Sequence, residues 1–575
     1  MTVASFGAAR SACTNRQGSV GWRTLSIAVA LAVHIIAPFA GAGAQSLGVG
    51  RSEVFAGSTF ESYLRYLQTL DKAEFYPFSI RHFGAAEIDM LAARDSAHPW
   101  ASRYSLQRDS TRGFRYNAVR PTVGFNYNTS YPFGRNDGIA WMGKGLTSSF
   151  QIGVAARWGP ISATLAPVAF RAENSEFELF DNGQVGRLHF NDGQFPFVID
   201  KPQRFGATPY SRVDLGESTL RVDLAGLAAG ISTASQWWGP ANDFPYIIGN
   251  NSGGFPHFFM GTSKPANAAI VKVHGRLVYG MLDQSAYSPV SGPDYFVSFF
   301  QTGKRRFVAG LVGVLQVKGA PGLEFGGARF FHAANPEGGI SRHNLALPVQ
   351  NFFKRGLKNE GDTVAGDDTS LRENQLASVF FRWAPPGSGF DIYGEYGRED
   401  FSADLRDLFL EPEHSAVTSL GFRKAWMTRG VLNAVRAEGF SYQASAGSRT
   451  RGEGQIYLHG TLLQGHTNRG QLLGAGAGAG SGSAQTVAYD RFSNRGRLTA
   501  FFSRATAHEQ AGFIRGVDAP LEGAVDVMNS IGAEVTRFAG PFDITGRLVF
   551  TSNINRNFLE DRGNATFGLT VTQNF

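Results

Sequence analysis

Apolar and polar residues alternate along several runs of about ten residues in the second part of the chain. In residues 146–158 one face carries Leu146, Ser148, Phe150, Ile152, Val154, Ala156 and Trp158. Residues 271–279, 542–551 and 566–575 repeat this period. A period of two predicts strands that are apolar on one face and polar on the other. The length of these runs fits a tilted strand that crosses a bilayer.

Two fold classes share this pattern. A soluble β-sandwich also alternates, but its strands are usually shorter and bulky aliphatic residues meet across its core. Here the faces opposite the apolar ones are rich in Arg, Glu, Asp, Thr and Gly, which suits a wet interior. The pattern therefore favours an all-β transmembrane barrel over the sandwich.

Aromatic residues and the carboxyl terminus support the barrel. Trp158, Tyr279, Trp383 and Trp426 fall at or near the ends of alternating runs, where an aromatic girdle would meet the membrane surface. Phe575 ends the last run in phase with its apolar face, which resembles the carboxy-terminal signal of outer-membrane barrels. The barrel-assembly machinery is therefore an expected partner during insertion.

Residues 113–575 are long enough for about 16–18 antiparallel strands. Several stretches lack clean alternation and are rich in Gly, Asn, Asp and Pro, and we expect them to form outer loops or plugging segments. They are 173–217, 236–267, 335–375, 401–415 and 465–490. A Gly-Ala repeat at 474–482 is of low complexity.

Residues 45–112 differ from the rest of the chain. Ser58 and Glu61 form a capping box, and Phe60, Tyr63, Leu64, Leu67 and Leu70 then follow at helical spacing. A second helix is expected over 85–93. Together they predict a small bundle of two or three helices that packs on something larger.

The first 44 residues have the order of a secretory signal. Arg10, Arg16 and Arg23 precede an apolar stretch at 25–37, and Ala42-Gly43-Ala44 predicts cleavage before Gln45. An uncleaved anchor is the alternative, although the stretch is short for one. We therefore expect export to the outer membrane, where the barrel would contact lipid.

Composition and charge argue against several classes of function. The sequence has 71 glycines, 48 phenylalanines and one cysteine, Cys13, which lies in the predicted signal. The rest of the chain therefore has no disulfide or thiolate metal site. Removing the signal takes three positive charges from the net +7 and leaves +4. This weak, dispersed basicity does not indicate nucleic-acid binding.

Three groups of motifs resemble the Wzi-type capsule assembly family. They are Tyr76-Pro77-Phe78-Ser79 with His98-Pro99-Trp100; Gln236-Trp237-Trp238-Gly239-Pro240 with Ile247-Ile248-Gly249-Asn250-Asn251 and Gly254-Phe255-Pro256-His257; and Gly465-His466-Thr467-Asn468-Arg469-Gly470-Gln471. The resemblance implies a barrel of about 18 strands with a small periplasmic helical bundle, residues 45–112, beside it. It also implies a non-enzymatic role in binding capsular or other surface polysaccharide. Ala241 replaces an expected glycine, and the Gly-Ala repeat replaces expected prolines, which leaves the identity of the glycan open.

Sugar binding uses flat aromatic faces together with amides and charged groups. The region around the Trp pair supplies this mixture in Gln236, Trp237, Trp238, Asn242, Asn250, Asn251 and His257. A second polar cluster consists of His466, Asn468 and Arg469. The alternatives are that the Trp pair anchors a loop inside the barrel, and that the second cluster is a solvated loop.

Two other function classes are alternatives to polysaccharide binding. A porin or substrate channel would use basic lumen-facing residues such as Lys272, Arg276 and Arg547. A hydrolase would need a catalytic constellation, and no motif for a serine nucleophile, zinc protease or phosphate-binding loop occurs. The acid pairs Glu176/Glu178, Glu399/Asp400 and Asp367/Asp368 have no fixed separation in the sequence. We therefore predict neither catalytic residues nor a metal or cofactor.

Overall fold

The computed structural model describes residues 53–91, 97–104, 113–290, 305–335, 339–350, 373–399, 405–445, 447, 455–474, 478–507 and 525–574. The predicted signal 1–44 and Phe575 lie outside them. None of the helices in this part of the chain has the length and apolar character needed to cross a membrane.

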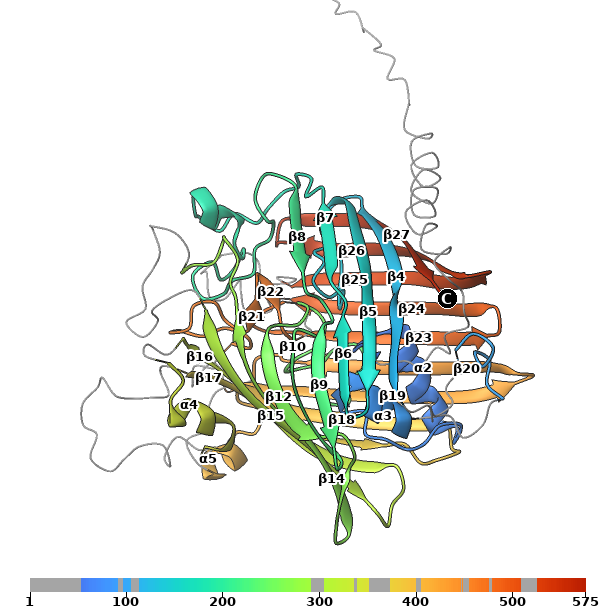
Figure 1. Ribbon diagram of the computed structural model, residues 1–575. Coiled ribbons are helices and arrows are strands. Elements are labelled where there is room, and N and C mark those ends of the chain that lie inside the picture. Colours follow the sequence, from blue (N-terminus) through green and yellow to red (C-terminus); the bar gives the residue numbers. More distant parts are fainter. Residues whose placement is uncertain are drawn as a thin grey trace, which may run out of the picture. The chain divides into compact units, whose positions relative to one another are not determined.

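The wall is an antiparallel sheet that closes on itself, with β27 beside β4 (Figure 1). Its segments are β4 (Phe114–Asn128), β5 (Gly145–Trp158), β6 (Ile161–Leu165), β7 (Val168–Ala172), β8 (Tyr210–Asp214), β9 (Thr219–Leu224), β10 (Leu227–Ser232), β12 (His257–Thr262), β13 (Ala266–Ala268), β14 (Val271–Leu282), β15 (Arg306–Val317), β16 (Leu323–Ala334), β17 (Glu373–Trp383), β18 (Phe390–Glu399), β19 (Ala416–Thr428), β20 (Val431–Ser441), β23 (Gly482–Ser493), β24 (Gly496–Ala507), β25 (Asp526–Ala539), β26 (Phe542–Arg556) and β27 (Glu560–Gln573). Three pairs of short segments, β6/β7, β8/β9 and β12/β13, each occupy one position in the wall. The 21 segments therefore make 18 strands among the described residues, which confirms the predicted barrel.

The two faces of the wall alternate as predicted. Val154, Phe550 and Phe567 are exposed on the outside, whereas Ala155, Val549 and Thr566 next to them are buried on the inner face. Trp158, Trp383 and Trp426 are also exposed at or near strand ends, as an aromatic girdle requires. Tyr279 is only half-buried, and its hydroxyl donates to the backbone oxygen of Leu345 over 2.6 Å.

One end of the barrel has short turns, such as 159–160 and 429–430, and the other has long connections, such as 173–209. This asymmetry is typical of outer-membrane barrels. The predicted irregular stretches were too wide, because β8 and β12 lie within two of them and β23 begins within a third. In β12 the inner face is itself apolar, since Phe259 packs on buried residues of the lumen, so the alternation disappears.

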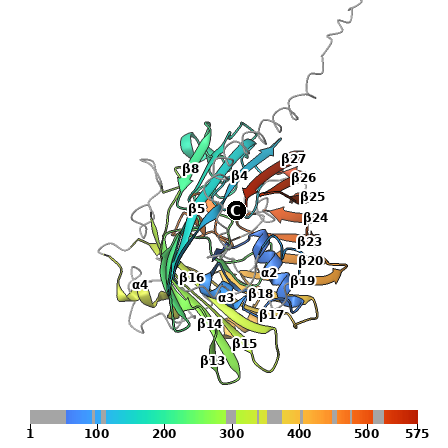
Figure 2. The same cartoon turned by 45° about the vertical axis from the view of Figure 1, so that its right-hand side comes forward.

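Residues 53–104 dock against the inner face of the wall near the short-turn end, where α2 (Thr59–Thr69) and α3 (Ala85–Met90) lie among the strands (Figure 2). Ser58 caps α2 by accepting the backbone N–H of Glu61 at 3.2 Å. The Arg65 guanidinium binds the Asp391 carboxylate of β18 at 2.6 Å. The Trp100 indole donates to the backbone oxygen of Ser493. Two short strands, β1 (Glu53–Val54) and β3 (Phe83–Gly84), pair with each other. The second helix ends at Met90, three residues before its predicted end.

The docking of α3 depends on a buried carboxylate. Glu87 accepts from Arg221 at 2.8 Å and from Arg276 at 3.2 Å. Burial alone would raise the pKa of Glu87, but the two guanidinium groups lower it from 4.5 to about 2. A depressed carboxylate pKa stabilises the folded state above pH 4.5, and this contribution is lost as the pH falls toward 2.

We therefore expect that protonation of Glu87 in acid lowers the free energy of unfolding by up to about 3 kcal/mol. Urea unfolding of the refolded barrel on either side of this pH window measures the loss. Glu87→Gln should be less stable at neutral pH and should show a smaller decrease in acid. An identical pH dependence in both proteins would contradict the assignment.

Candidate functional site

The predicted Trp pair lies in a segment that enters the lumen between β10 and β12. We call residues 233–256 and 455–474 the plug. Within it β11 (Trp237–Trp238) pairs with β2 (Ile80–Arg81) of the amino-terminal segment. The ring of Trp238 is buried and packs edge-on against Phe330 of β16, with centroids 5.9 Å apart. The Arg81 guanidinium lies over the ring of Trp237 at 4.6 Å. The pair thus joins the plug, the amino-terminal segment and the wall.

The second predicted cluster also belongs to the plug, beside a small hairpin of β21 (Thr467–Asn468) and β22 (Gln471–Leu472). His466 is fully buried, its Nε2 lies 2.6 Å from the backbone oxygen of Ile247, and burial lowers its pKa to about 3. Asn468 donates to the backbone oxygen of Gly254 at 3.3 Å. The solvated-loop alternative is therefore wrong for these two residues. Arg469 is half-buried and forms ion pairs with Asp214 and Asp283.

The remaining predicted residues are divided between structural contacts and a cavity. The side-chain oxygen of Gln236 accepts from Arg276 at 3.0 Å, and its amide lies 3.4 Å from His257. Asn250 donates to the backbone oxygen of Ala56 at 3.2 Å. Of the ten predicted residues, three line the cavity described next, and these are Trp237, Asn242 and Asn251.

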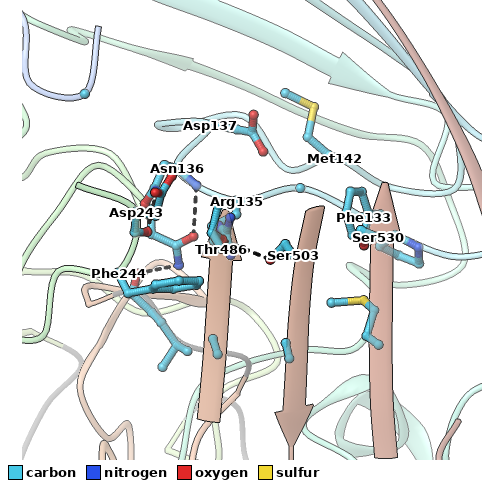
Figure 3. Close-up of a pocket in the computed structure, with 18 of the residues that line it drawn as sticks. Phe133, Arg135, Asn136, Asp137, Met142, Asp243, Phe244, Thr486, Ser503 and Ser530 are labelled. Carbon is cyan, nitrogen blue, oxygen red and sulfur yellow. Dashed lines mark hydrogen bonds between the residues drawn. The ribbon is translucent and has the colours of Figure 1, made fainter. Parts of the chain in front are cut away.

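The cavity has a volume of about 650 Å³ and lies between the plug and the inner face of β20 and β23–β26. The β4–β5 connection, residues 129–144, covers part of it and contributes Phe133, Arg135, Asn136 and Asp137 (Figure 3). The Asn136 amide donates to the backbone oxygen of Asp243, which holds this connection against the plug.

Aromatic rings, hydroxyls and charges all face this cavity. Phe133, Trp141 and Phe244 supply rings, and Thr486, Ser503 and Ser530 supply hydroxyls from three neighbouring strands (Figure 3). The lining also holds seven cationic and five anionic side chains: Arg81, Arg135, Lys201, Arg436, Arg497, Arg547 and Arg556, with Glu61, Asp137, Asp243, Asp526 and Glu534.

Most of these charges are already paired. Arg436 binds Asp243, Arg497 binds Glu534, and Arg81 binds Glu61. The guanidinium groups of Arg135 and Arg547 form no hydrogen bond or ion pair with any residue that the structure describes. The Arg135 guanidinium instead lies over the ring of Phe244 at 4.4 Å, and burial lowers its pKa.

Arg135 and the hydroxyls of β23–β25 were not among the predicted residues. The alternation in the sequence indicates that Arg547 faces the lumen, and the same alternation in β24 and β25 identifies Ser503 and Ser530 as lumen-facing. The β4–β5 connection gave no signal of its own, because its importance comes from residues of the plug and of β26 that lie far away in the sequence.

Comparison with known proteins identifies the family. The model of the capsule assembly protein Wzi matches residues 132–536, which are 405 of the 575 residues. The chain belongs to the Wzi capsule assembly family. The family model spans the plug, the covering connection and most of the cavity-lining strands. No curated protein matches the sequence.

One solved structure agrees with the Wzi fold. Wzi of Escherichia coli, described as an outer-membrane protein involved in group 1 capsule assembly and as a carbohydrate-binding β-barrel, has a TM-score of 0.59 at 14% identity. The match covers 91% of this chain and 99% of that one. OpdQ of Pseudomonas aeruginosa has a TM-score of 0.36 at 9% identity and covers 80% and 97%. Because the chain belongs to the Wzi family and its described residues form an 18-stranded wall, it is an outer-membrane β-barrel.

Proposed function

We propose that this protein binds a surface polysaccharide in the cavity between plug and wall, and so helps to assemble or retain that polysaccharide at the cell surface. Family membership and the mixed aromatic, hydroxyl and charged lining support the proposal. The observation that carries it is the pair of half-buried cations, Arg135 and Arg547, whose guanidinium groups line the cavity without an ion-pair partner among the described residues.

The chemistry of the lining suggests how a saccharide would be held. Phe133 and Trp141 offer faces for the apolar side of a pyranose ring, and the strand hydroxyls can bond to sugar hydroxyls. The two unpaired guanidinium groups suit a sugar that carries a carboxylate, because charge-assisted hydrogen bonds are stronger than neutral ones. Burial raises the pKa of the Asp137 carboxyl, which lines the same part of the cavity.

We also propose that residues 45–112 face the periplasm, since the described part of this segment docks at the short-turn end of the barrel. The barrel-assembly machinery and outer-membrane lipid remain proposed partners. No catalytic role is proposed. Glu178 binds Arg562, and Glu399 accepts from the Asn374 amide, so neither faces the cavity. Asp367, Asp368 and Asp400 lie outside the described residues.

Replacing Arg135 and Arg547 together by alanine should weaken glycan binding at least about tenfold, because each lost charge-assisted bond is worth more than 1 kcal/mol. Binding of acidic and neutral capsular oligosaccharides to the refolded full chain, followed by calorimetry, measures the effect. Arg305→Ala is the matched control, since Arg305 is exposed and pairs with Asp283 outside the cavity. Equal affinities in the double variant and the control, or no affinity in the native protein, would overturn the proposal.

A further inference from the structure

The wall of the barrel is interrupted at one height on one side. β6 and β7 are separated at Ala166 and Pro167, and β8 and β9 are separated at residues 215–218. At the same level β10 ends at Ser232 and β12 begins at His257. Toward the long-loop end, β8 pairs only with β7, and the last two residues of β14 pair only with β15. No described strand continues the ladder between β8 and β14 there.

An apolar recess of about 790 Å³ opens on the outside of the barrel at this interruption. Its lining includes the outward-facing residues Leu165, Leu220, Ile231, Phe258, Met281 and Phe307. The register places Leu220 beside Ile231 and Ile231 beside Phe258, so these side chains form one continuous row. The row continues the lipid-facing surface, because Val154, Leu220 and Phe258 are all exposed to the surroundings of the barrel.

Polar groups bound the recess toward the long-loop end. Arg469 of the plug binds Asp214, which ends β8, and Asp283, which follows β14, so one guanidinium spans the interrupted wall. Arg305 binds Asp283 from the exposed side. An apolar depression below a charged rim matches the change from acyl chains to headgroups across a bilayer.

A surface segment borders the recess on its other side. Ile340 lines the recess, and α4 (Arg342–Ala346) follows it, with η3 (Leu347–Val349) after that. Leu347 packs against the outward-facing Phe307 and Phe331, and Tyr279 donates to the backbone oxygen of Leu345. This segment therefore lies against the outside of β14–β16 and deepens the depression.

We propose that this recess binds one acyl chain of a lipid of the surrounding bilayer. Its volume is within the range of ordinary ligand pockets, and its lining offers apolar contacts on several sides. The bound chain would fill the place that wall strands occupy elsewhere in the barrel. The inference is independent of polysaccharide binding, since the recess and the cavity share no lining residue.

Two matched pairs of variants test the proposal in the refolded full chain. Ala163→Trp fills the recess, whereas Ala533→Trp adds the same ring at an outward position of β25. Ile231→Ala removes a recess side chain that is 59% exposed, and Ile531→Ala removes one that is 63% exposed elsewhere on the wall. Unchanged heat-modifiable mobility on gels confirms that each variant folds.

Native mass spectrometry after transfer from phosphatidylethanolamine vesicles into mild detergent measures retained lipid. We expect one retained lipid on the native protein and on both control variants. Retention should be at least about tenfold weaker in Ala163→Trp and weaker also in Ile231→Ala, because each variant loses apolar contact area. No retained lipid on the native protein, or equal retention within each matched pair, would overturn the proposal.

Discussion

Replacing Asp391 by asparagine is expected to lower the unfolding free energy by about 3 to 5 kcal/mol, which is the usual cost of removing one partner from a buried charge group. The Asp391 side chain has no solvent exposure and binds Arg65 at 2.6 Å and Arg382 at 3.0 Å, with Arg423 at 3.9 Å. Arg382 also binds Glu324 at 3.0 Å. The substitution preserves the shape of the side chain but leaves three buried cations with one carboxylate.

The loss should be localised as well as global, because Arg65 is the residue through which α2 binds β18. Urea unfolding of the refolded protein measures the global effect, and hydrogen exchange of residues 59–69 measures the release of the helix. Glu560→Gln is the control, since its ion pair with Arg562 is half-exposed and such pairs contribute little. If Asp391→Asn unfolded at the same urea concentration as this control, the network would not hold the amino-terminal segment.

The strands of the wall could be predicted from their lipid-facing residues, but the packing of the plug inside the lumen could not. Every second residue of a strand faces lipid and is therefore apolar, so residues such as Val154 and Phe550 mark the strands in the sequence. Inside, the plug removes the contrast: Phe259 and Val312 face the lumen but are apolar because they pack on other buried residues.

The candidate cavity was harder to predict for the same reason. The Gln-Trp-Trp-Gly-Pro motif identified the correct segment. In the structure, however, most of its side chains anchor the plug and do not line the cavity. Trp238 pairs with Ile80, which is remote in sequence, and this contact cannot be inferred from local spacing. Arg135 and Arg547 line the same cavity because the β4–β5 connection folds over the lumen. Neither residue belongs to a recognisable motif.

Substitution of Trp238 is expected to have the second large effect on stability, because the plug, the amino-terminal segment and the wall all pack at this residue. Trp238→Ala should cost about 3 to 5 kcal/mol, since a large buried ring is removed and the cavity left behind is lined by a rigid wall. Its indole N–H is buried with no hydrogen-bond partner among the described residues. Trp238→Phe should therefore lower the free energy of unfolding much less than Trp238→Ala, because phenylalanine keeps an aromatic ring and has no N–H group that would be buried without a partner.

The same variant tests whether the lumen is closed by packing. Planar-bilayer recording should show no steady open conductance for the native protein, whose plug residues pack against Phe330 and Phe380 of the wall. Trp238→Ala should produce frequent transient openings, and Trp238→Phe should produce few. Trp158→Ala provides the control, because that ring is 65% exposed on the outer surface and contacts no part of the plug. A steady large conductance in the native protein would instead favour the porin alternative, since ions would then pass beside a plug that Trp238 does not seal.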